Sequence, residues 1–286
     1  MRILILGASG FIGTHLVCEL GSSGHEVIAR CRSGLVAGFT GNCRAWELGN
    51  SIEIPPDGPI DCAIHLAHDF GGVAGAKLTI EGTMRSVMEL RRCGVVRQIF
   101  FSSYSARPNA PSVYGRTKYL LEQSLGDNQD VTIIRPGLVI GGGGIYGRIE
   151  KAAGILPIIP LPDGGRGLVP VIDIDRLCSE TIRLATARTI SNVYNLFEPR
   201  LLSLRELTIG AAQKKGRRPI ILPLPSPGVL LILTALEKLR IPLPVKADNL
   251  RGFIGNQQAG HVSDLGNEQY VSPDFTATAR QRRLPR

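Results

Sequence analysis

The stretch "RILILGASGFIG", residues 2–13, decides the fold of this chain. It opens with a run of large apolar side chains, which is typical of a strand covered on both faces. A glycine turn follows at once, with Gly7, Gly10 and Gly13 in the spacing G-x-x-G-x-x-G, and then an amphipathic helix. Such glycines allow a close approach of the backbone to a pyrophosphate, whose charge suits a helix N-terminus. The stretch predicts a dinucleotide-binding turn, with a merely tight turn as the alternative because the chain holds 34 glycines.

Strand and helix patterns alternate through the first half of the chain. Short branched or aromatic runs predict strands at 25–29, 61–68, 96–103 and 130–137, and helical spacing predicts helices at 78–94 and 112–126. This alternation predicts an α/β fold with a Rossmann-type doubly wound parallel sheet, covered by helices on both faces.

The regular alternation breaks after Gly137. Four glycines at 141–144 and a proline-rich stretch at 155–170 precede a returning strand–helix pattern and a late strand. We expect a dinucleotide-binding Rossmann domain at 1–140, with returning segments at about 168–196, and a smaller, discontinuous C-terminal substrate-binding lobe from 141–167 and 197–286. The apolar stretch "VLLILTALEKL", residues 229–239, is expected to pack within this lobe, with docking on a membrane or a partner as the alternative.

The composition fits an ordinary soluble globular protein, with 43% hydrophobic and 20% charged residues. Its six cysteines are scattered without a C-x-x-C pair or a histidine cluster, which argues against a metal site and for reduced thiols. A strand pattern that starts at Met1 leaves no room for a signal peptide, and the longest apolar stretch is too short to cross a bilayer. We therefore expect a cytoplasmic protein with no metal and no stable membrane insertion.

The chain is basic, with a formal net charge of +9. The basic residues gather in "KKGRR", residues 214–218, and in the tail "TARQRRLPR", residues 278–286. We interpret both as solvated surface, so no nucleic-acid partner is expected, and nucleic-acid binding through the tail is the alternative. The charge is consistent with a general preference for anionic substrates.

The stretch "SVYGRTKYLLEQ", residues 112–123, places Tyr114 and Lys118 four apart on one helix face. A phenol has an ordinary pKa of about 10, and an ammonium group held nearby lowers it by roughly 1–3 units. Tyr114 would then exchange a proton with a substrate oxygen while hydride moves between that carbon and a nicotinamide.

Two serines, Ser102 and Ser103, end the strand that precedes this helix. Ligand sites of parallel sheets lie at the carboxyl ends of the strands, where a hydroxyl can hold the reacting oxygen. We assign this role to Ser103. The alternative, that the two serines only satisfy loop backbone, has more weight for Ser102 than for Ser103.

The second strand ends in "ARCRS", residues 29–33, where an NAD site usually carries an acid that holds the ribose 2′-hydroxyl. Arg30 and Arg32 stand there instead, and a guanidinium group suits a 2′-phosphate. The sequence thus favours NADP as the cofactor, with NAD as second choice. The alternative is that either arginine points to water.

Together these segments resemble an extended short-chain dehydrogenase/reductase of the NAD-dependent epimerase/dehydratase family, over more than two thirds of the chain. The segments that carry the resemblance are "GASGFIG" (7–13), "IDCAIHLAH" (60–68), "IFFSS" (99–103), "YGRTK" (114–118), "TIIRPGLVIG" (132–141), "VIDIDRL" (171–177), "NVYNL" (192–196) and "LSLREL" (202–207).

The resemblance implies a catalytic set of Ser103, Tyr114 and Lys118. It also implies which residues contact the cofactor. Gly7, Gly10, Phe11, Ile12 and Gly13 would contact the pyrophosphate, Glu47 and Leu48 the adenine, Leu66 and Ala67 the nicotinamide ribose, and Pro136 the nicotinamide ring. Tyr114 and Lys118 would lie beside these residues and also contact the cofactor.

The sequence departs from the family pattern in three places. Thr79 stands where the family has an asparagine, which weakens the usual proton-relay argument. Ser103 is followed by Tyr104 and Ser105, where dehydratases resemble one another in having Asp-Glu, so dehydration is not expected. His68 stands where a small residue is common, and it either faces the substrate or is a plain loop histidine.

The function implied is an NAD(P)-dependent oxidoreductase or epimerase acting at a carbinol or carbonyl carbon of a nucleotide sugar or a related polar metabolite. Arg200, Arg205 and Arg251 are candidate partners of a diphosphate or ordinary surface arginines. A homodimer is expected by analogy with the family. The alternative function is a catalytically silent NAD(P)-binding sensor or accessory scaffold.

Overall fold

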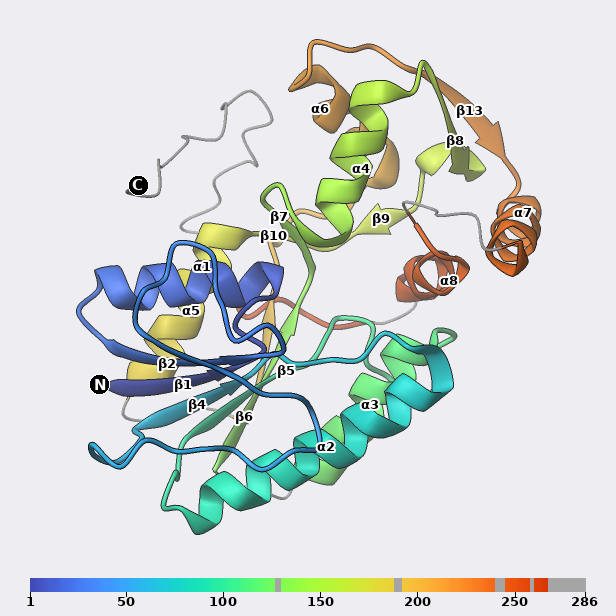
Figure 1. Ribbon diagram of the computed structural model, residues 1–286. Helices are drawn as coiled ribbons and strands as arrows, with labels where there is room; N and C mark the ends of the chain where they lie inside the picture. Colours follow the sequence, from blue (N-terminus) through green and yellow to red (C-terminus); the bar gives the residue numbers. More distant parts are fainter. Residues whose placement is uncertain (127–129, 188–191, 240–244, 258–259, 267–286) are drawn as a thin grey trace.

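The centre of the molecule is a seven-stranded parallel sheet (Figure 1). The computed structural model describes residues 1–126, 130–187, 192–239, 245–257 and 260–266. The strand order across the sheet is β11-β6-β5-β4-β1-β2-β3. The strands are β1 (Arg2–Leu6), β2 (Glu26–Cys31), β3 (Asn42–Ala45), β4 (Cys62–His65), β5 (Gln98–Phe101), β6 (Val131–Pro136) and β11 (Val193–Leu196).

Helices cover both faces of this sheet. In Figure 1, α1 (Phe11–Ser22) and α5 (Ile174–Thr186) lie above the sheet, and α2 (Gly72–Arg92) and α3 (Val113–Leu125) lie below it. Every residue of β1, β4 and β5 is buried, as the continuous apolar runs require when both faces are covered. The predicted doubly wound fold is confirmed. The short strand β3, whose sequence "NCRA" has no strand pattern, was not predicted.

The order of the strands reverses between β1 and β4. From β1 the chain proceeds to β2 on one side, whereas β4 pairs with the other side of β1 and leads on to β5 and β6. Ligands of doubly wound sheets bind in the crevice at such a switch point. The loops that follow β1 and β4 therefore line the candidate site.

The later part of the chain forms a smaller group of elements beside the carboxyl ends of the strands (Figure 1). Three two-stranded sheets pair β7 (Leu138–Ile140) with β10 (Val171–Asp173), β9 (Leu168–Val169) with β12 (Leu202–Ser203), and β8 (Ile158–Pro162) with β13 (Ile220–Leu224). The helices are α4 (Gly144–Ile155), the 3-10 turn η1 (Asp163–Gly165), α6 (Leu204–Gln213), α7 (Ser226–Lys238) and α8 (Ala247–Asn256). Tyr146 of α4 and Leu207 of α6 are fully buried in their common core.

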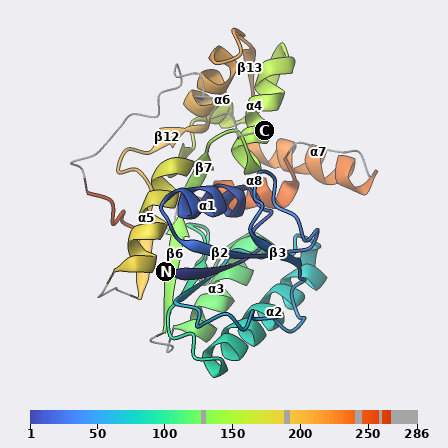
Figure 2. The same ribbon diagram turned by 60° about the vertical axis from the view of Figure 1, so that its left-hand side comes forward.

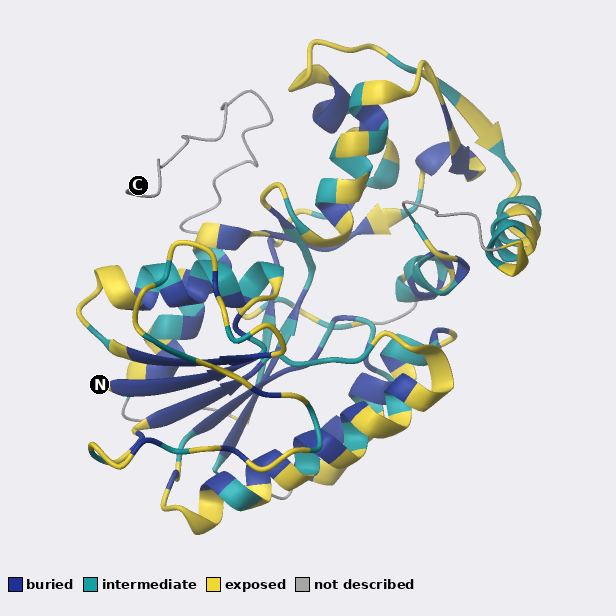
Figure 3. Ribbon diagram, viewed as in Figure 1, coloured by how far each residue is buried: buried dark blue, intermediate teal, exposed yellow. Residues whose placement is uncertain are grey.

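Helix α7 does not pack as the sequence suggested. None of its thirteen residues is buried, and the side chains of Leu231 and Ile232 are 73% and 51% exposed. The stretch was predicted to pack within the lobe, and it does contact α8 and β8 there, but these contacts leave every residue of the helix at least partly exposed. Figure 3 shows the helix in the colours of exposed and intermediate residues, and in the turned view of Figure 2 it projects from the molecule.

Across the described residues, every helix falls short of the length or the apolar character that crossing a bilayer requires. The basic tail 278–286 lies outside the described residues.

Candidate functional site

The glycine turn after β1 is built so that only glycine fits. Gly7 adopts a φ of +92°, in the left-handed region, and a Cβ there would lie 2.7 Å from the backbone nitrogen of Ala67. A Cβ on Gly13 would lie 2.6 Å from the carbonyl oxygen of Gly7. The turn is held by the N–H groups of Gly7 and Ala8, which both donate to the carbonyl oxygen of Arg30. The close approach of three backbone segments leaves a cradle of the kind that a pyrophosphate occupies.

Helix α1 begins at this cradle. Its N-cap is Gly10, which offers no side chain to the first N–H groups, so these groups remain for an anion. The ring of Phe11 packs against the glycine run at Gly143, and Ile12 packs against the main core. The sequence-predicted pyrophosphate residues therefore lie together, and Phe11 and Ile12 form the first turn of α1.

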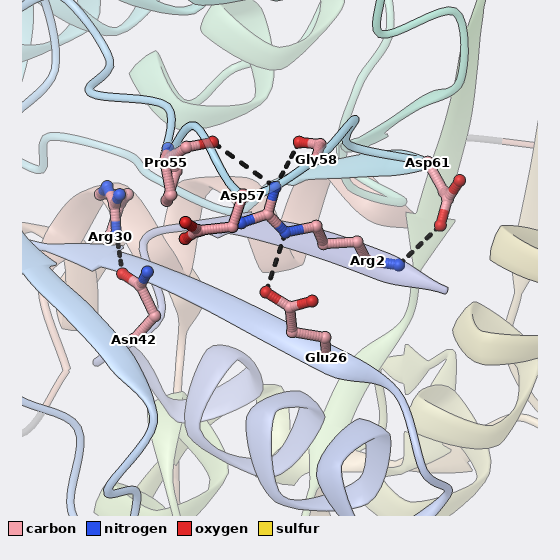
Figure 4. A network of polar contacts seen from close by, with 8 residues as sticks. All are labelled: Arg2, Glu26, Arg30, Asn42, Pro55, Asp57, Gly58 and Asp61. Atoms are coloured by element: carbon pink, nitrogen blue, oxygen red, sulfur yellow. Dashed lines mark hydrogen bonds and ion pairs between the residues drawn. The ribbon is translucent and has the colours of Figure 1, made fainter.

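The two arginines near the end of β2 have different surroundings. Arg30 is only 1% exposed, and its guanidinium donates to the carbonyl oxygen of Glu53 at 2.7 Å and to the side-chain oxygen of Asn42 at 3.1 Å (Figure 4). Arg32 is exposed, and no hydrogen bond or ion pair from the described chain engages its side chain. The structure thus leaves Arg32, and not Arg30, with a guanidinium group open to a ligand.

The predicted adenine residues lie in the loop after β3. Glu47 is exposed, whereas Leu48 packs against a hydrophobic cluster that includes Leu4 and Leu6 of β1 and against Gly82 of α2. The indole of Trp46 is buried and donates to the carbonyl oxygen of Asn50 at 3.1 Å, which fixes this loop.

The loop after β4 joins the glycine turn to the tyrosine. Leu66 donates its N–H to the carbonyl oxygen of Leu6, and the backbone of Ala67 closes against Gly7. The next residue, His68, lies edge-on to the ring of Tyr114, with ring centroids 4.9 Å apart. Two consecutive residues, Ala67 and His68, therefore connect the glycine turn with the phenol of Tyr114.

The predicted catalytic residues come together at the carboxyl ends of β5 and β6. Helix α3 begins after Ser112, whose hydroxyl accepts the N–H of Gly115 at 3.0 Å. The Ser103 hydroxyl lies near enough to the phenol of Tyr114 to lower its pKa, and it accepts the N–H of Ser105 at 3.1 Å. The Lys118 ammonium donates to the carbonyl oxygen of Phe101 at 2.6 Å. Pro136, the predicted neighbour of the nicotinamide, is buried at the end of β6.

The electrostatics of the pair differ from the sequence-based expectation. Burial raises the pKa of Tyr114 to about 12, against a smaller lowering by the hydrogen bond to Ser103. Burial lowers the pKa of Lys118 to about 7, opposed by the charge of Glu122. The ammonium lies 5.8 Å from the centre of the phenol ring and is bonded to a backbone carbonyl. The expected lowering of the phenol's pKa by Lys118 is therefore not found, because desolvation dominates.

Phe70 and the ring of His68 complete an aromatic group around the phenol. Phe70 stacks on Tyr114 with centroids 6.0 Å apart and lies edge-on to His68 at 4.6 Å. Burial and the charge of Lys118 lower the pKa of His68 to about 3, so its ring is neutral at physiological pH. Its Nδ1 is buried without a hydrogen-bond partner in the described structure. This orphaned atom fits a histidine that faces a ligand.

Sequence reasoning missed a buried ion pair behind the site. The carboxylate of Glu122 accepts two hydrogen bonds from Arg135, at 2.8 and 2.6 Å, and a third from the hydroxyl of Ser102. Ser102 is thus structural, as expected, although its partner is a side chain. The only sequence signal was that Glu122 follows Lys118 by one helical turn.

A second missed residue is Asp248 of α8. Its carboxylate accepts the N–H of Val113 at 2.8 Å and the N–H of Tyr114 at 3.3 Å. It therefore satisfies orphan donors in the first turn of α3 and complements the helix dipole. No local pattern could reveal this contact, since 134 residues separate Asp248 from Tyr114.

The remaining polar candidates are placed as follows. The buried hydroxyl of Thr79 donates to the carbonyl oxygen of Gly75 and accepts the N–H of Asp69. The three candidate diphosphate arginines are exposed, and Arg200 is paired with Glu206 at 3.4 Å. A cavity of about 500 Å³ is lined by other residues: Tyr104, Phe197, Pro199, Leu201, His261, Val262, Ser263, Leu265 and Gly266.

Known proteins resemble this chain in sequence and in fold. It is 26% identical over 246 residues to a ceramide reductase of Caulobacter vibrioides, covering 80% of this chain and 75% of the relative. Among solved structures, a UDP-glucose 4-epimerase of Thermotoga maritima with UDP-glucose shares 20% identity, with a TM-score of 0.63, over 90% of this chain and 99% of that one. MoeE5 in complex with UDP-glucose and NAD shares 22% identity, with a TM-score of 0.62, over 79% of this chain and 85% of that one.

The model of one protein family matches residues 3–148, which span β1 to the first turn of α4 and include the glycine turn, Ser103, Tyr114 and Lys118. This match covers half of the chain. The chain belongs to the NAD dependent epimerase/dehydratase family.

Proposed function

We propose that this protein is an NAD(P)-dependent oxidoreductase or epimerase that acts at a carbinol or carbonyl carbon, with Tyr114 as the proton-transfer residue. One observation carries the proposal. The ring of Tyr114, with the Ser103 hydroxyl beside it, contacts His68, and the preceding residue, Ala67, contacts Gly7 of the glycine cradle. A substrate oxygen held by this pair would therefore stand beside the place that the cradle gives to a dinucleotide.

The cradle fits a nicotinamide dinucleotide because a Cβ at Gly7 would fill it and the first turn of α1 has free N–H groups. Gly7, Gly10 and Gly13 would hold the pyrophosphate, Glu47 and Leu48 would lie by the adenine, and Leu66 and Ala67 by the nicotinamide ribose. When bound, the cofactor would supply or accept the hydride. Arg32 would hold a 2′-phosphate, which makes NADP the preferred form, with NAD second.

The phenol is set up as an acid. With a pKa near 12, Tyr114 holds its proton at neutral pH and can give it to an oxygen that gains charge as its carbon is reduced. Ser103 orients that oxygen through its own hydroxyl. Lys118, with a pKa near 7, can exchange a proton at the pH of the reaction, since a group transfers protons best when its pKa lies near the working pH. Dehydration lacks support, because Tyr104 and Ser105 are not acids.

Hydride transfer at this carbon interconverts an alcohol and a ketone, and the net reaction depends on what happens to that ketone. A reductase releases an alcohol and consumes the reduced cofactor, whereas an epimerase returns the hydride to the other face of the same carbon. The similarity to a ceramide reductase supports the first outcome and the likeness to a UDP-glucose 4-epimerase supports the second. The two are separated by the nicotinamide absorbance, which falls in a reductase and stays constant over an epimerase's full turnover.

For the substrate we keep the nucleotide sugars that two structural neighbours bind, and add lipid alcohols or ketones of the kind named in the reductase relative. The unpaired Nδ1 of His68 offers either class a hydrogen bond beside the phenol. A thermal-shift screen of both classes with NADPH present would choose between them.

The decisive experiment replaces Tyr114 by phenylalanine. We expect kcat to fall by about 10²–10⁴, with the affinity for NADPH unchanged, since the phenyl ring keeps its contacts with His68 and Phe70. Tyr119→Phe, the same change one turn along α3, is the matched control and should keep its activity. A Tyr114→Phe enzyme as fast as the wild type would exclude the proposed role. Binding of NADPH without turnover of any carbonyl or alcohol would favour the scaffold reading.

A further inference from the structure

Helix α7 is apolar around its whole circumference but is not part of any core. Its middle reads "VLLILTAL", residues 229–236, so successive turns present leucine or isoleucine in every direction. A helix of this kind is normally buried in a large core or in lipid. Among the described residues, those of α8 and β8 contact α7, and they leave Leu231 and Ile232 largely exposed.

The sheet of β8 and β13 adds to the exposed apolar surface. Ile158 stands opposite Ile220 in the register, and both are exposed, as is Leu222 two residues on. The alternate residues Ile159 and Ile221 point the other way, into or against the core of the lobe. These exposed side chains lie on elements that adjoin one another, because α7 contacts β8, β8 pairs with β13, and Ile155 and Leu156 lead from α4 into β8. We call this surface the apolar face; it comprises Ile155, Leu156, Ile158, Ile220, Leu222, Leu231, Ile232 and Leu239.

Positive charge borders the apolar face. The segment that leads into β13 is "KKGRR", in which Lys215, Arg217 and Arg218 are exposed, whereas the side chain of Lys214 is only 24% exposed. Lys214 pairs with Glu150 at 3.9 Å, whereas Lys215, Arg217 and Arg218 make no ion pair within the described chain. Residues 144–167 and 200–239 together carry ten basic and four acidic side chains. An occupant of the face must therefore be apolar and must carry negative charge at its rim.

The geometry points to one occupant: we propose that the apolar face docks on the surface of a bilayer that contains anionic lipids. A helix of thirteen residues is about 20 Å long, too short for a hydrocarbon core of about 30 Å, so α7 would lie in the plane of the interface. Leu231 and Ile232 would enter the acyl region, while Arg217 and Arg218 bind lipid phosphates. A second copy is a poor occupant, because two such faces would bring their basic segments together.

This docking surface is connected to the site but does not depend on the reaction proposed above. Helix α7 packs on α8, and α8 holds the first turn of α3 through Asp248. A protein docked on its apolar face would thus keep the crevice, and the helix that carries Tyr114, close to the lipid surface.

The test is co-sedimentation of the full chain with vesicles. Vesicles of phosphatidylcholine and phosphatidylglycerol in equal parts should pellet the wild-type protein, and vesicles of phosphatidylcholine alone should pellet about tenfold less. The double variant Leu231→Asp/Ile232→Asp and the double variant Arg217→Gln/Arg218→Gln should each lose about tenfold or more of the binding. High salt should weaken the wild type in the same direction.

A matched control is Val96→Asp. Val96 is 69% exposed, lies in the loop before β5 and is outside the apolar face, so this variant should bind as the wild type does. Wild-type protein that stays in the supernatant with anionic vesicles would overturn the proposal. So would equal binding by Leu231→Asp/Ile232→Asp and Val96→Asp. Sedimentation velocity adds a third outcome against it: a wild-type dimer that the Leu231→Asp/Ile232→Asp variant lacks would assign the face to a second copy.

Discussion

The imidazole of His68 lies edge-on against the phenol of Tyr114, with ring centroids 4.9 Å apart and planes at 78°. This contact joins the two halves of the site. The loop after β4 contacts the glycine turn through Ala67 and helix α3 through His68. A displacement of this loop would therefore alter the cofactor cradle and the position of the phenol together.

The His68 contact makes the protein sensitive to acid. The pKa of His68 is about 3 in the folded protein against an ordinary value of 6.5, so between these values the unfolded chain binds more protons. The free energy of unfolding must then fall as the pH drops below 6.5, by up to about 2 kcal/mol at pH 5. His68→Phe removes this contribution while it keeps an aromatic ring. Urea unfolding at pH 7 and pH 5 should show a smaller loss for the variant, and equal losses would contradict the neutral, buried histidine.

The two serines at the end of β5 should separate chemistry from stability. Ser103→Ala should lower kcat by about 10²–10³ with little change in melting temperature, because its hydroxyl faces the reacting oxygen. Ser102→Ala should keep most of the activity and lose about 1–3 kcal/mol of stability, because it takes a donor from the buried carboxylate of Glu122. Turnover and thermal unfolding of both variants check this. The reverse pattern would exchange the two roles.

The glycine turn should not tolerate a methyl group. Gly7→Ala would force a side chain into a left-handed φ and against the backbone of Ala67, so it should cost about 1–3 kcal/mol of stability and weaken NADPH binding. Gly21→Ala is the matched control, since nothing lies within 4 Å of a Cβ there and α1 should gain about 0.5–1 kcal/mol. Calorimetric titration with NADPH measures the effect. Unchanged affinity in Gly7→Ala would place the dinucleotide elsewhere.

Cofactor choice should depend on Arg32. Arg32→Ala should raise KM for NADP by about 10–100-fold and leave KM for NAD unchanged, as expected for the loss of one charge-assisted hydrogen bond to a phosphate. Arg30→Ala should instead lower the melting temperature, because its buried guanidinium ties β2 to Glu53 and Asn42. Steady-state kinetics with both cofactors decide the question. Equal changes of both KM values in Arg32→Ala would speak against a 2′-phosphate site.

The parts of the structure that were predictable depend on local patterns. The apolar run of β1, the glycine spacing at residues 7–13 and the four-residue spacing of Tyr114 and Lys118 each reflect a backbone period, so the sheet and the catalytic helix follow from sequence. The pKa values of Tyr114 and Lys118 could not be predicted from the sequence. Spacing places Lys118 on the same helix face as the phenol, but only the folded chain shows the ammonium bonded to Phe101 and the phenol desolvated.

Contacts between distant segments were also beyond the sequence. Arg135 completes the ion pair of Glu122 from the next strand, and α8 reaches α3 from the far end of the chain. The exposure of α7 is of the same kind: an apolar helix indicates that an apolar environment is needed, and the sequence does not state whether the rest of the chain supplies it.

The contact of Asp248 with the start of α3 has a consequence for redesign. Asp248 belongs to the late part of the chain, yet it helps to set where the catalytic helix begins. A chimera that exchanged residues after Gly137 for those of another family member would therefore inherit more than a new specificity. Unless the other family member has an acidic residue at the position of Asp248, the chimera would lose a contact that stabilises the start of α3, the helix that carries Tyr114. Selectivity and turnover would therefore have to be engineered together.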